Sequence, residues 1–339
     1  MKRISLILSL VLSSISFGQN TTRFAQINFA QGVNNPAAIA HDGLIMADMI
    51  FRNQWLGVEG APTTIAFNGQ YEINEDHAVG LNIYHDRIGV HNTTSFSAQY
   101  AYRAHLDNVR SFSFGLSLGA DNVVNDLAAS QTSIIGDPVF STSYSSLFFN
   151  GSFGIYYNAP KFYFGASIPQ LFQNTIRGKQ TGFEPQRWHY YVSTGIYLDA
   201  GDNFTFNPHL QLKTALDAPM QADLILRNTI RNRFSIVVGY RTTSAIIAGV
   251  DFLISKNARI GYSFNYDVGT LAKTKGGSNE LYFGLAFPYH SDRGSFAKRR
   301  YLGRKKGTYN RNYTNNSHRR QNSRGNKYGR DTRNRRRGH

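Results

Sequence analysis

The sequence predicts an all-β protein, a transmembrane antiparallel β-barrel of about 14 strands, with a signal peptide and a disordered basic C-terminal tail. Strand-like segments with alternating apolar and polar residues recur along most of the chain. Beyond the N-terminus, no apolar run approaches the ~18 residues that a transmembrane helix needs. The composition, with 20 Tyr, 24 Phe and 31 Gly, suits twisted strands and aromatic girdles. The absence of Cys excludes disulfides and thiolate metal sites.

Residues 1–18 are predicted to be a signal peptide. Lys2 and Arg3 form a charged start, an apolar run follows, and Gly18 is a small residue suited to a cleavage site. The alternative is a short transmembrane anchor. However, the apolar run has about a dozen residues, whereas a spanning helix needs about 20. We therefore expect the mature chain to begin at Gln19.

Residues 19–42 lack a clean period and contain the turn-forming motif Asn35-Pro36-Ala37. We expect an ordered but irregular lead-in, lying inside the barrel or at its periplasmic mouth.

The region 43–290 is predicted to be the barrel. Within residues 259–267, for example, Ile, Tyr, Phe and Tyr alternate with Arg, Gly, Ser, Asn and Asp. One face of such a strand suits lipid and the other suits a polar lumen. The predicted strands span 43–54, 63–72, 77–87, 91–104, 109–121, 145–157, 161–168, 187–198, 204–214, 220–229, 233–242, 244–254, 259–268 and 279–288. The gap at Thr243 is too short for a hairpin loop, so the two strand ends beside it should retreat.

The predicted connections fall into two classes by length. If the first strand runs outward, every even-to-odd connection is periplasmic and should be short. These connections are all short and each contains Asn or Asp, whereas the long connections at 122–144, 169–186 and 269–278 are all odd-to-even. A strand count wrong by one would mix the two classes. The same parity places the C-terminal tail in the periplasm.

The last predicted strand begins near Gly277 and has apolar residues at odd positions from 281 to 287. Its end, with Gly284, Phe287 and Tyr289, resembles the aromatic closing signal of outer-membrane barrels. In a closed barrel this strand must pair with the first, because an open edge in lipid leaves backbone groups unsatisfied.

The formal net charge of +16 belongs almost entirely to the tail, residues 291–339. The tail holds 17 Lys or Arg and 2 Asp, a net charge of +15, and it has almost no aliphatic residues, so it should be disordered. Its clustered basic residues are Arg299, Arg300, Arg304, Lys305, Lys306, Arg319, Arg320, Arg335, Arg336 and Arg337.

Interleaved Arg and Tyr would indicate RNA binding in a cytosolic protein, but the signal peptide argues against a nucleic-acid partner. Anionic lipid, peptidoglycan carboxylates or an acidic periplasmic protein are the remaining candidates. The alternative is a solvated tail with no dedicated partner.

A distinctive motif follows the first predicted strand. It reads as a strand end, a Trp near a membrane interface, a tight Gly-containing loop and a Pro that starts the return strand. On these residues alone it is a well-made hairpin. The residues that define it are Gln54, Trp55, Gly57, Gly60, Ala61, Pro62 and Thr64.

The sequence of this motif closely resembles the signature of the PorP/SprF family, outer-membrane proteins of the type IX secretion system of Bacteroidota. Further matching stretches follow in the family's order: the Asn-Pro-Ala motif, then 218–224, 239–241, 259–262 and 277–281. The resemblance spans about residues 1–290. His41 and Asn279 are mild departures from the family pattern, and the tail lies outside it.

This resemblance implies a non-enzymatic outer-membrane protein that assists export or surface attachment of particular secreted proteins, such as gliding adhesins. It also implies that the secretion machinery is a partner and that the signature residues could form an interaction surface. A passive porin or hydrophobic-solute channel is the alternative, since a barrel of this size can hold an open lumen.

Enzyme activity is not expected, because the chain has no nucleophile elbow, zinc motif or Gly-rich phosphate loop, and no cofactor is predicted. The pair His85-Asp86 near an outer strand end could contribute to a hydrolase site. Predicted lumen charges suit either a solvated or self-paired interior or a selectivity filter. These charges are Arg187, Arg233, Arg241, Arg259, Asp251, Asp267 and Glu280.

Overall fold

The computed structural model describes residues 24–39, 44–107, 109–127, 143–175, 180–182, 188–201, 203–216, 218–242, 245–268 and 277–288. The predicted signal peptide and the basic tail lie outside these residues.

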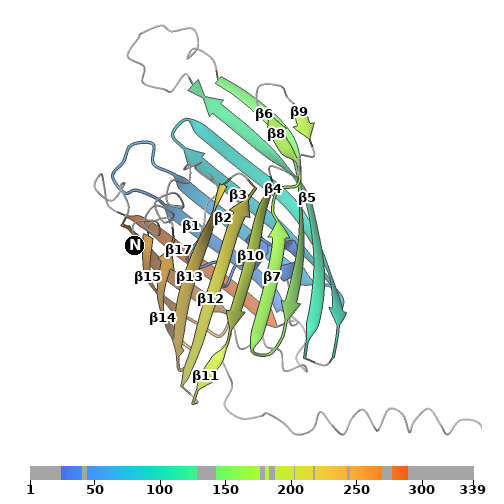
Figure 1. Ribbon diagram of the computed structural model, residues 1–339, viewed down its shortest axis with the longest axis vertical. Helices are drawn as coiled ribbons and strands as arrows, with labels where there is room; N and C mark the ends of the chain where they lie inside the picture. Colours follow the sequence, from blue (N-terminus) through green and yellow to red (C-terminus); the bar gives the residue numbers. More distant parts are fainter. Residues whose placement is uncertain are drawn as a thin grey trace, which may run out of the picture. The chain divides into compact units, whose positions relative to one another are not determined.

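Fourteen antiparallel strands close into a single barrel, as the sequence predicted (Figure 1). The strands are β1 (Leu44–Asn53), β2 (Thr63–Glu72), β3 (His77–Ile88), β4 (His91–His105), β5 (Ser111–Asp126), β6 (Ser143–Asn158), β7 (Phe162–Ile168), β10 (His189–Ile196), β12 (Phe204–Ala215), β13 (Ala218–Ile230), β14 (Phe234–Arg241), β15 (Ala245–Leu253), β16 (Ala258–Asp267) and β17 (Ser278–Pro288). The short β11 (Leu198–Ala200) continues β10 beyond Tyr197 and pairs with the same neighbour, β12. A separate pair, β8 (Gln173–Thr175) and β9 (Gln180–Gly182), lies outside the barrel sheet.

The barrel closes between β1 and β17, whose register runs from Leu44 opposite Pro288 to Asn53 opposite Asn279. Side chains along β17 alternate between the outer and the inner face of the barrel, as expected. Leu281 is 47% exposed on the outer side, whereas Glu280 is fully buried. The last strand therefore pairs with the first, as the need to satisfy every backbone group in lipid requires.

Most strand ends lie within two residues of their predicted positions. β14 ends at Arg241 and β15 begins at Ala245, so both retreat from Thr243 as expected. β5 and β6 extend further than predicted, to Asp126 and from Ser143, and their pairing continues to these residues.

At one end of the barrel every connection is short, and every long connection lies at the other end, beside the short β3–β4, β12–β13 and β14–β15 turns. Side-chain carboxylates and amides shape the short turns, since Asn74 Oδ1 accepts from the backbone N–H of His77 at 2.9 Å. Asp107 likewise accepts from the N–H groups of Val109 and Arg110 at 2.9 and 2.7 Å. These bonds, together with the Arg110 side chain, lower the pKa of the exposed Asp107.

Residues 24–39, which we call the lumenal segment, lie inside the barrel and pack on its inward side chains. It contains two short 3-10 helices, η1 (Gln31–Val33) and η2 (Pro36–Ala38). Its apolar side chains are buried against inward-facing strand residues, as Phe24 and Ile27 are against Met46 and Ile50. In the described part of the chain, no helix is long and apolar enough to cross a membrane.

Candidate functional site

Glu280 of β17 holds the start of the lumenal segment. Its carboxylate accepts hydrogen bonds from the backbone N–H groups of Ala25 at 2.9 Å and of Gln26 at 2.7 Å. The Glu280 side chain is completely buried. Two charge-assisted bonds at one carboxylate are strong, and they satisfy backbone donors that would otherwise be buried without partners.

Phe29 lies in a buried cage of aromatic and cationic side chains. Its ring stacks on Tyr282 with 5.1 Å between centroids. The guanidinium groups of Arg227 and Arg259 lie 3.7 and 4.8 Å from the Phe29 ring centroid, within cation–π range. Both arginines contact Asp251, with Arg227 Nη1 at 2.7 Å from its carboxylate. The cage thus ties the lumenal segment to β13, β15, β16 and β17.

The Asn-Pro-Ala motif forms the far end of the lumenal segment, at η2. The Asn35 side chain caps η2 by accepting from Ala37 N at 2.9 Å, and it donates to Ile155 O of β6 at 3.0 Å. A Cβ on Gly115 of β5 would overlap the backbone of Pro36 and Ala37. The motif therefore lies inside the barrel, so close to β5 that the facing position on this strand must be a glycine.

The middle of the lumenal segment is held by side chains of three further strands. Asn82 of β3 donates to Val33 O at 3.3 Å, and Gln99 of β4 donates to Gly32 O at 2.8 Å. Ser167 of β7 donates to Asn34 O at 2.8 Å. Together with Glu280 of β17 and Arg227 of β13, these anchors hold the segment from both halves of the barrel wall, so the segment crosses the lumen.

The signature motif forms the loop between β1 and β2, residues 54–62. The backbone N–H of Gln54 donates to Pro62 O at 2.9 Å and closes the loop at its base. Trp55 has a φ of 46°, which is uncommon for an aromatic residue, and Gly57 and Gly60 have φ of 82° and 69°. The glycines occupy left-handed positions that side chains would strain.

The β1–β2 loop is bonded to both of its neighbours at the rim. Leu56 N donates to Gly277 O, just before β17, at 3.3 Å, and Gly89 N in the β3–β4 turn donates to Gly60 O at 2.9 Å. A Cβ on Gly60 would lie 3.3 Å from Gly89 Cα. The loop therefore links the closing seam of the barrel to the β3–β4 turn.

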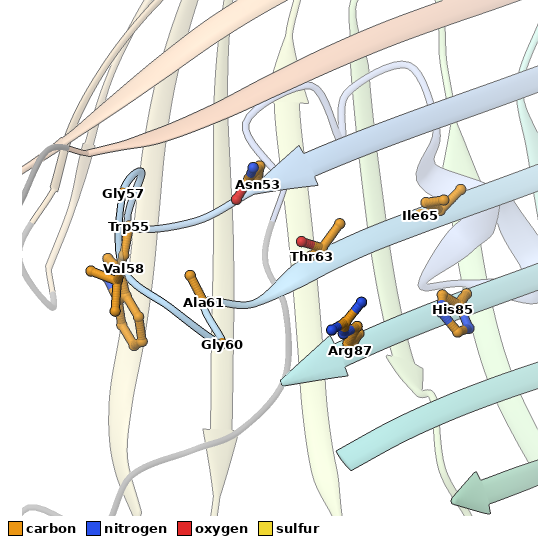
Figure 2. A pocket seen from close by; sticks show the side chains of 10 residues that line it. All are labelled: Asn53, Trp55, Gly57, Val58, Gly60, Ala61, Thr63, Ile65, His85 and Arg87. Atoms are coloured by element: carbon orange, nitrogen blue, oxygen red, sulfur yellow. The ribbon is translucent and has the colours of Figure 1, made fainter. Parts of the chain in front are cut away.

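A pocket of about 400 Å³ lies beneath this loop on the outer side of the barrel (Figure 2). We call it the rim pocket; its wall is the β1–β2 loop, and its floor is formed by outward side chains of β1, β2 and β3. The floor residues are Asn53, Thr63, Ile65, His85 and Arg87. Their outward direction follows from alternation, because the intervening Thr64 and Ala66 are fully buried in the interior.

The side chains of His85 and Asp86 point to opposite faces of β3, so they do not act as one pair. Asp86 faces inward and accepts from Thr64 Oγ1 at 2.6 Å, whereas His85 faces outward with Nδ1 2.9 Å from Thr94 Oγ1. Among the described residues, no group of His, Asp and Glu is placed to hold a metal ion.

Three of the predicted lumen charges, Arg241, Arg259 and Asp251, form ion pairs, partly with the inward residues Arg227 and Asp223, which were not among those predicted. Asp251 contacts two arginines, as described above, and Arg241 lies 3.0 Å from Asp223. Arg233 was expected in the lumen, but it is exposed in the turn between β13 and β14, where the strands have already ended. Arg187 lies outside the described residues, and Asp267 is half-buried at the end of β16.

Sequence reasoning did not identify the partners of the lumenal segment. Arg227 was not singled out, although its inward position on β13 could have been read from alternation. The sequence could not predict the contacts of Phe29 with Arg227 and of Asn35 with Ile155, because each pair is separated by more than 100 positions along the chain. The floor of the rim pocket also brings together residues from three strands that no motif unites.

A closed fourteen-stranded barrel with an apolar exterior and a polar interior is an outer-membrane β-barrel protein. The family model described as Type IX secretion system membrane protein PorP/SprF matches residues 16–285, and the chain belongs to this family. It is therefore an outer-membrane component of the type IX secretion system, and association with the secretion machinery follows from its family. No curated protein matches the chain.

The chain is similar to several solved structures. CymD, a monoaromatic hydrocarbon channel, has a TM-score of 0.50 at 11% identity, covering 78% of this chain and 94% of its own. The Ralstonia pickettii toluene transporter TbuX has a TM-score of 0.47 at 12% identity, covering 82% and 100%. Acinetobacter baumannii Omp33 has a TM-score of 0.42 at 8% identity, covering 73% and 100%. At 11% identity, the similarity to CymD shows a shared fold and nothing about function.

Proposed function

We propose that this protein assists export or surface attachment of particular secreted proteins, such as gliding adhesins of a member of the Bacteroidota, and that it is neither a conducting pore nor an enzyme. The observation that carries the proposal is the lumenal segment. It places buried side chains in the interior and is held by Glu280, by the cage around Phe29 and by Ile155 of β6. A barrel built in this way suits an assembly partner, because its outer surfaces and loops stay available while its interior is occupied.

The signature loop is the surface that we propose contacts the secretion machinery or its substrate. Leu56 and Val58 at its tip are 40% and 39% exposed, and Glu59 beside them is also exposed. The bonds to Gly277 and Gly89 fix the loop in place. A rigid loop with exposed apolar residues loses little entropy on binding, which favours a specific contact.

The alternative function is a passive porin or hydrophobic-solute channel, which would need a continuous path through the barrel. The buried lumenal segment and the ion pairs of Asp223 and Asp251 argue against such a path. A selectivity filter is disfavoured for the same reason, because charges that neutralise each other do not select passing ions.

The proposal is tested by deleting the gene. We expect surface display of one or a few secreted proteins to be lost, measured by surface proteomics, while uptake of small solutes is unchanged. Liposomes containing the purified protein should swell no faster in small sugars than protein-free liposomes. Reduced solute uptake with intact secretion would instead establish the channel.

A further inference from the structure

The rim pocket lies at the level where the apolar outer band of the barrel ends. On β3 the outward residues run Val79, Leu81 and Ile83, and then change to His85 and Arg87. Such a change from apolar to polar on the lipid-facing side marks the boundary between hydrocarbon and headgroups.

The neighbouring strands change at the same level. On β4, opposite β3, the outward Phe96 is followed by Thr94, which pairs with His85 in register. On β2, Ile65 is followed by Thr63, which lies opposite Arg87. The boundary is therefore a property of this part of the wall, and the pocket opens beside the headgroups of the outer leaflet. This orientation uses the strand parity that places the long connections outside.

The charge of the pocket floor is positive. The exposed Arg87 carries a permanent charge, and His85 lies two positions earlier on β3, on the same face of the strand. No ion pair between described residues of the chain involves Arg87. The nearest carboxylate along the strand, Asp86, points to the opposite face and is bonded to Thr64.

Other lining residues add hydrogen-bond donors and an aromatic ring. Asn53 and Thr63 supply a side-chain amide and a hydroxyl, and Trp55 lies at the wall of the same pocket (Figure 2). Indole rings are favoured at the headgroup level, where one edge is polar and the face is apolar. Below the donors, Ile65 begins the apolar surface that acyl chains cover.

From this arrangement we infer that the rim pocket binds the anionic, phosphate-bearing headgroup of an outer-leaflet lipid. Arg87 faces the phosphate with its planar fork of donors, and His85, Asn53 and Thr63 contribute further bonds. The acyl chains lie along Ile65 and Ile83. A free phosphate ion shares the headgroup chemistry, but it makes no use of the apolar surface directly beneath the pocket.

The test uses the full-length protein purified in detergent and native mass spectrometry. The probes are phosphorylated lipid A, the same lipid with its phosphates removed, and inorganic phosphate. We expect phosphorylated lipid A to be retained, phosphate-free lipid A to be retained about tenfold less, and inorganic phosphate not to displace the lipid. Arg87→Gln should also lower retention of the phosphorylated lipid about tenfold.

Arg233→Gln is the matched control, because Arg233 is an exposed arginine in a turn at the other end of the barrel. It should retain the lipid as the unaltered protein does. Heat-modifiable migration on gels confirms that each variant is folded, so loss of the lipid cannot be ascribed to unfolding. Equal retention by Arg87→Gln, or equal retention of phosphate-free lipid A, would overturn the inference. Displacement by inorganic phosphate would overturn it in favour of a free-anion site.

Discussion

Glu280 is a buried carboxylate whose two oxygens accept backbone N–H groups from a segment 254 and 255 positions away in sequence. Removing the carboxylate leaves both donors buried without a partner. Each such group costs about 1–3 kcal/mol. At the scale of the residue, this one side chain joins the last strand of the barrel to the segment that fills it.

Glu280→Ala should therefore lower the stability of the barrel by about 2–6 kcal/mol, whereas Glu280→Gln, which keeps one acceptor oxygen, should cost less. The measurement is the temperature at which heat-modifiable migration changes. Glu59→Ala is the control, because Glu59 is an exposed carboxylate in the β1–β2 loop. If the migration of Glu280→Ala changed at the same temperature as that of Glu59→Ala, the bonds of Glu280 would contribute nothing measurable to the stability of the barrel.

Trp55 tests the signature loop as an interaction surface. Trp55→Ala should abolish surface display of the secreted substrate while the abundance of folded barrel is unchanged, as measured by surface labelling and heat-modifiable migration. Trp188→Ala is the matched control, because Trp188 is the only other Trp and lies beside β10, where its indole donates to Leu171 O at 2.9 Å. Normal display by Trp55→Ala would leave the motif as a hairpin without a dedicated partner.

At the scale of the element, we propose that the lumenal segment determines whether the barrel conducts. It is bonded to strands around the barrel wall and carries little regular structure of its own. Its conformation is therefore imposed by the barrel, through side chains that accept or donate to its backbone.

Deleting residues 24–39 should open a path through the barrel. We expect ion conductance across planar bilayers where the intact protein shows none, because the inward-facing charged residues of the wall become accessible to water. Deletion of residues 291–339 provides the control, since it removes chain without emptying the lumen and should leave conductance absent. Conductance by the intact protein equal to that of the 24–39 deletion would contradict the proposed function.

The basic tail is the second element with a testable role. Its net charge of +15 should attract it to an anionic component of the periplasm, by about 1 kcal/mol per Lys or Arg close to an anionic surface. We propose that it tethers the barrel to an acidic protein of the secretion machinery or to the cell wall. Truncation after Tyr289 should leave the barrel inserted but lose a partner that co-purifies at low salt.

That partner should also dissociate from the full chain near 1 M salt, where the Debye length falls to about 3 Å from about 10 Å at 0.1 M. An unchanged set of co-purifying proteins after truncation would identify the tail as a solvated appendage. Cleavage of the tail by protease added outside intact cells would contradict its periplasmic location.

At the scale of the whole molecule, the barrel combines an apolar exterior with an interior of paired charges and packed side chains. Closure between β1 and β17 leaves no barrel edge exposed to lipid. The protein is an outer-membrane component of its secretion system, so its chain must first be exported across the inner membrane.

The N-terminus of the protein isolated from outer membranes should therefore be Gln19. Edman degradation or mass spectrometry of the intact protein measures this, and the start is expected because the apolar run before Gly18 is too short to span a bilayer. A chain that retained Met1 in the outer membrane would show that residues 1–18 act as an anchor.

The sequence alone determined the number of strands, their approximate ends and the two classes of connection. These follow from alternation with a period of two and from turn residues, which are local properties of neighbouring positions. It also determined that the last strand closes the barrel, because lipid permits no open edge. Among the described residues, the predicted inward charges Arg241, Arg259, Asp251 and Glu280 were assigned in the same way, whereas Arg233 lies beyond its strand.

Only the tertiary structure decided what these inward residues do. The bonds of Glu280 to Ala25 and Gln26, and the cage around Phe29, join residues that are distant along the chain. The rim pocket likewise depends on register between β1, β2 and β3 and on the bond between Gly89 and Gly60. Alternation assigns a side chain to a face of the sheet, but its neighbour on that face depends on how the closed barrel brings distant strands together.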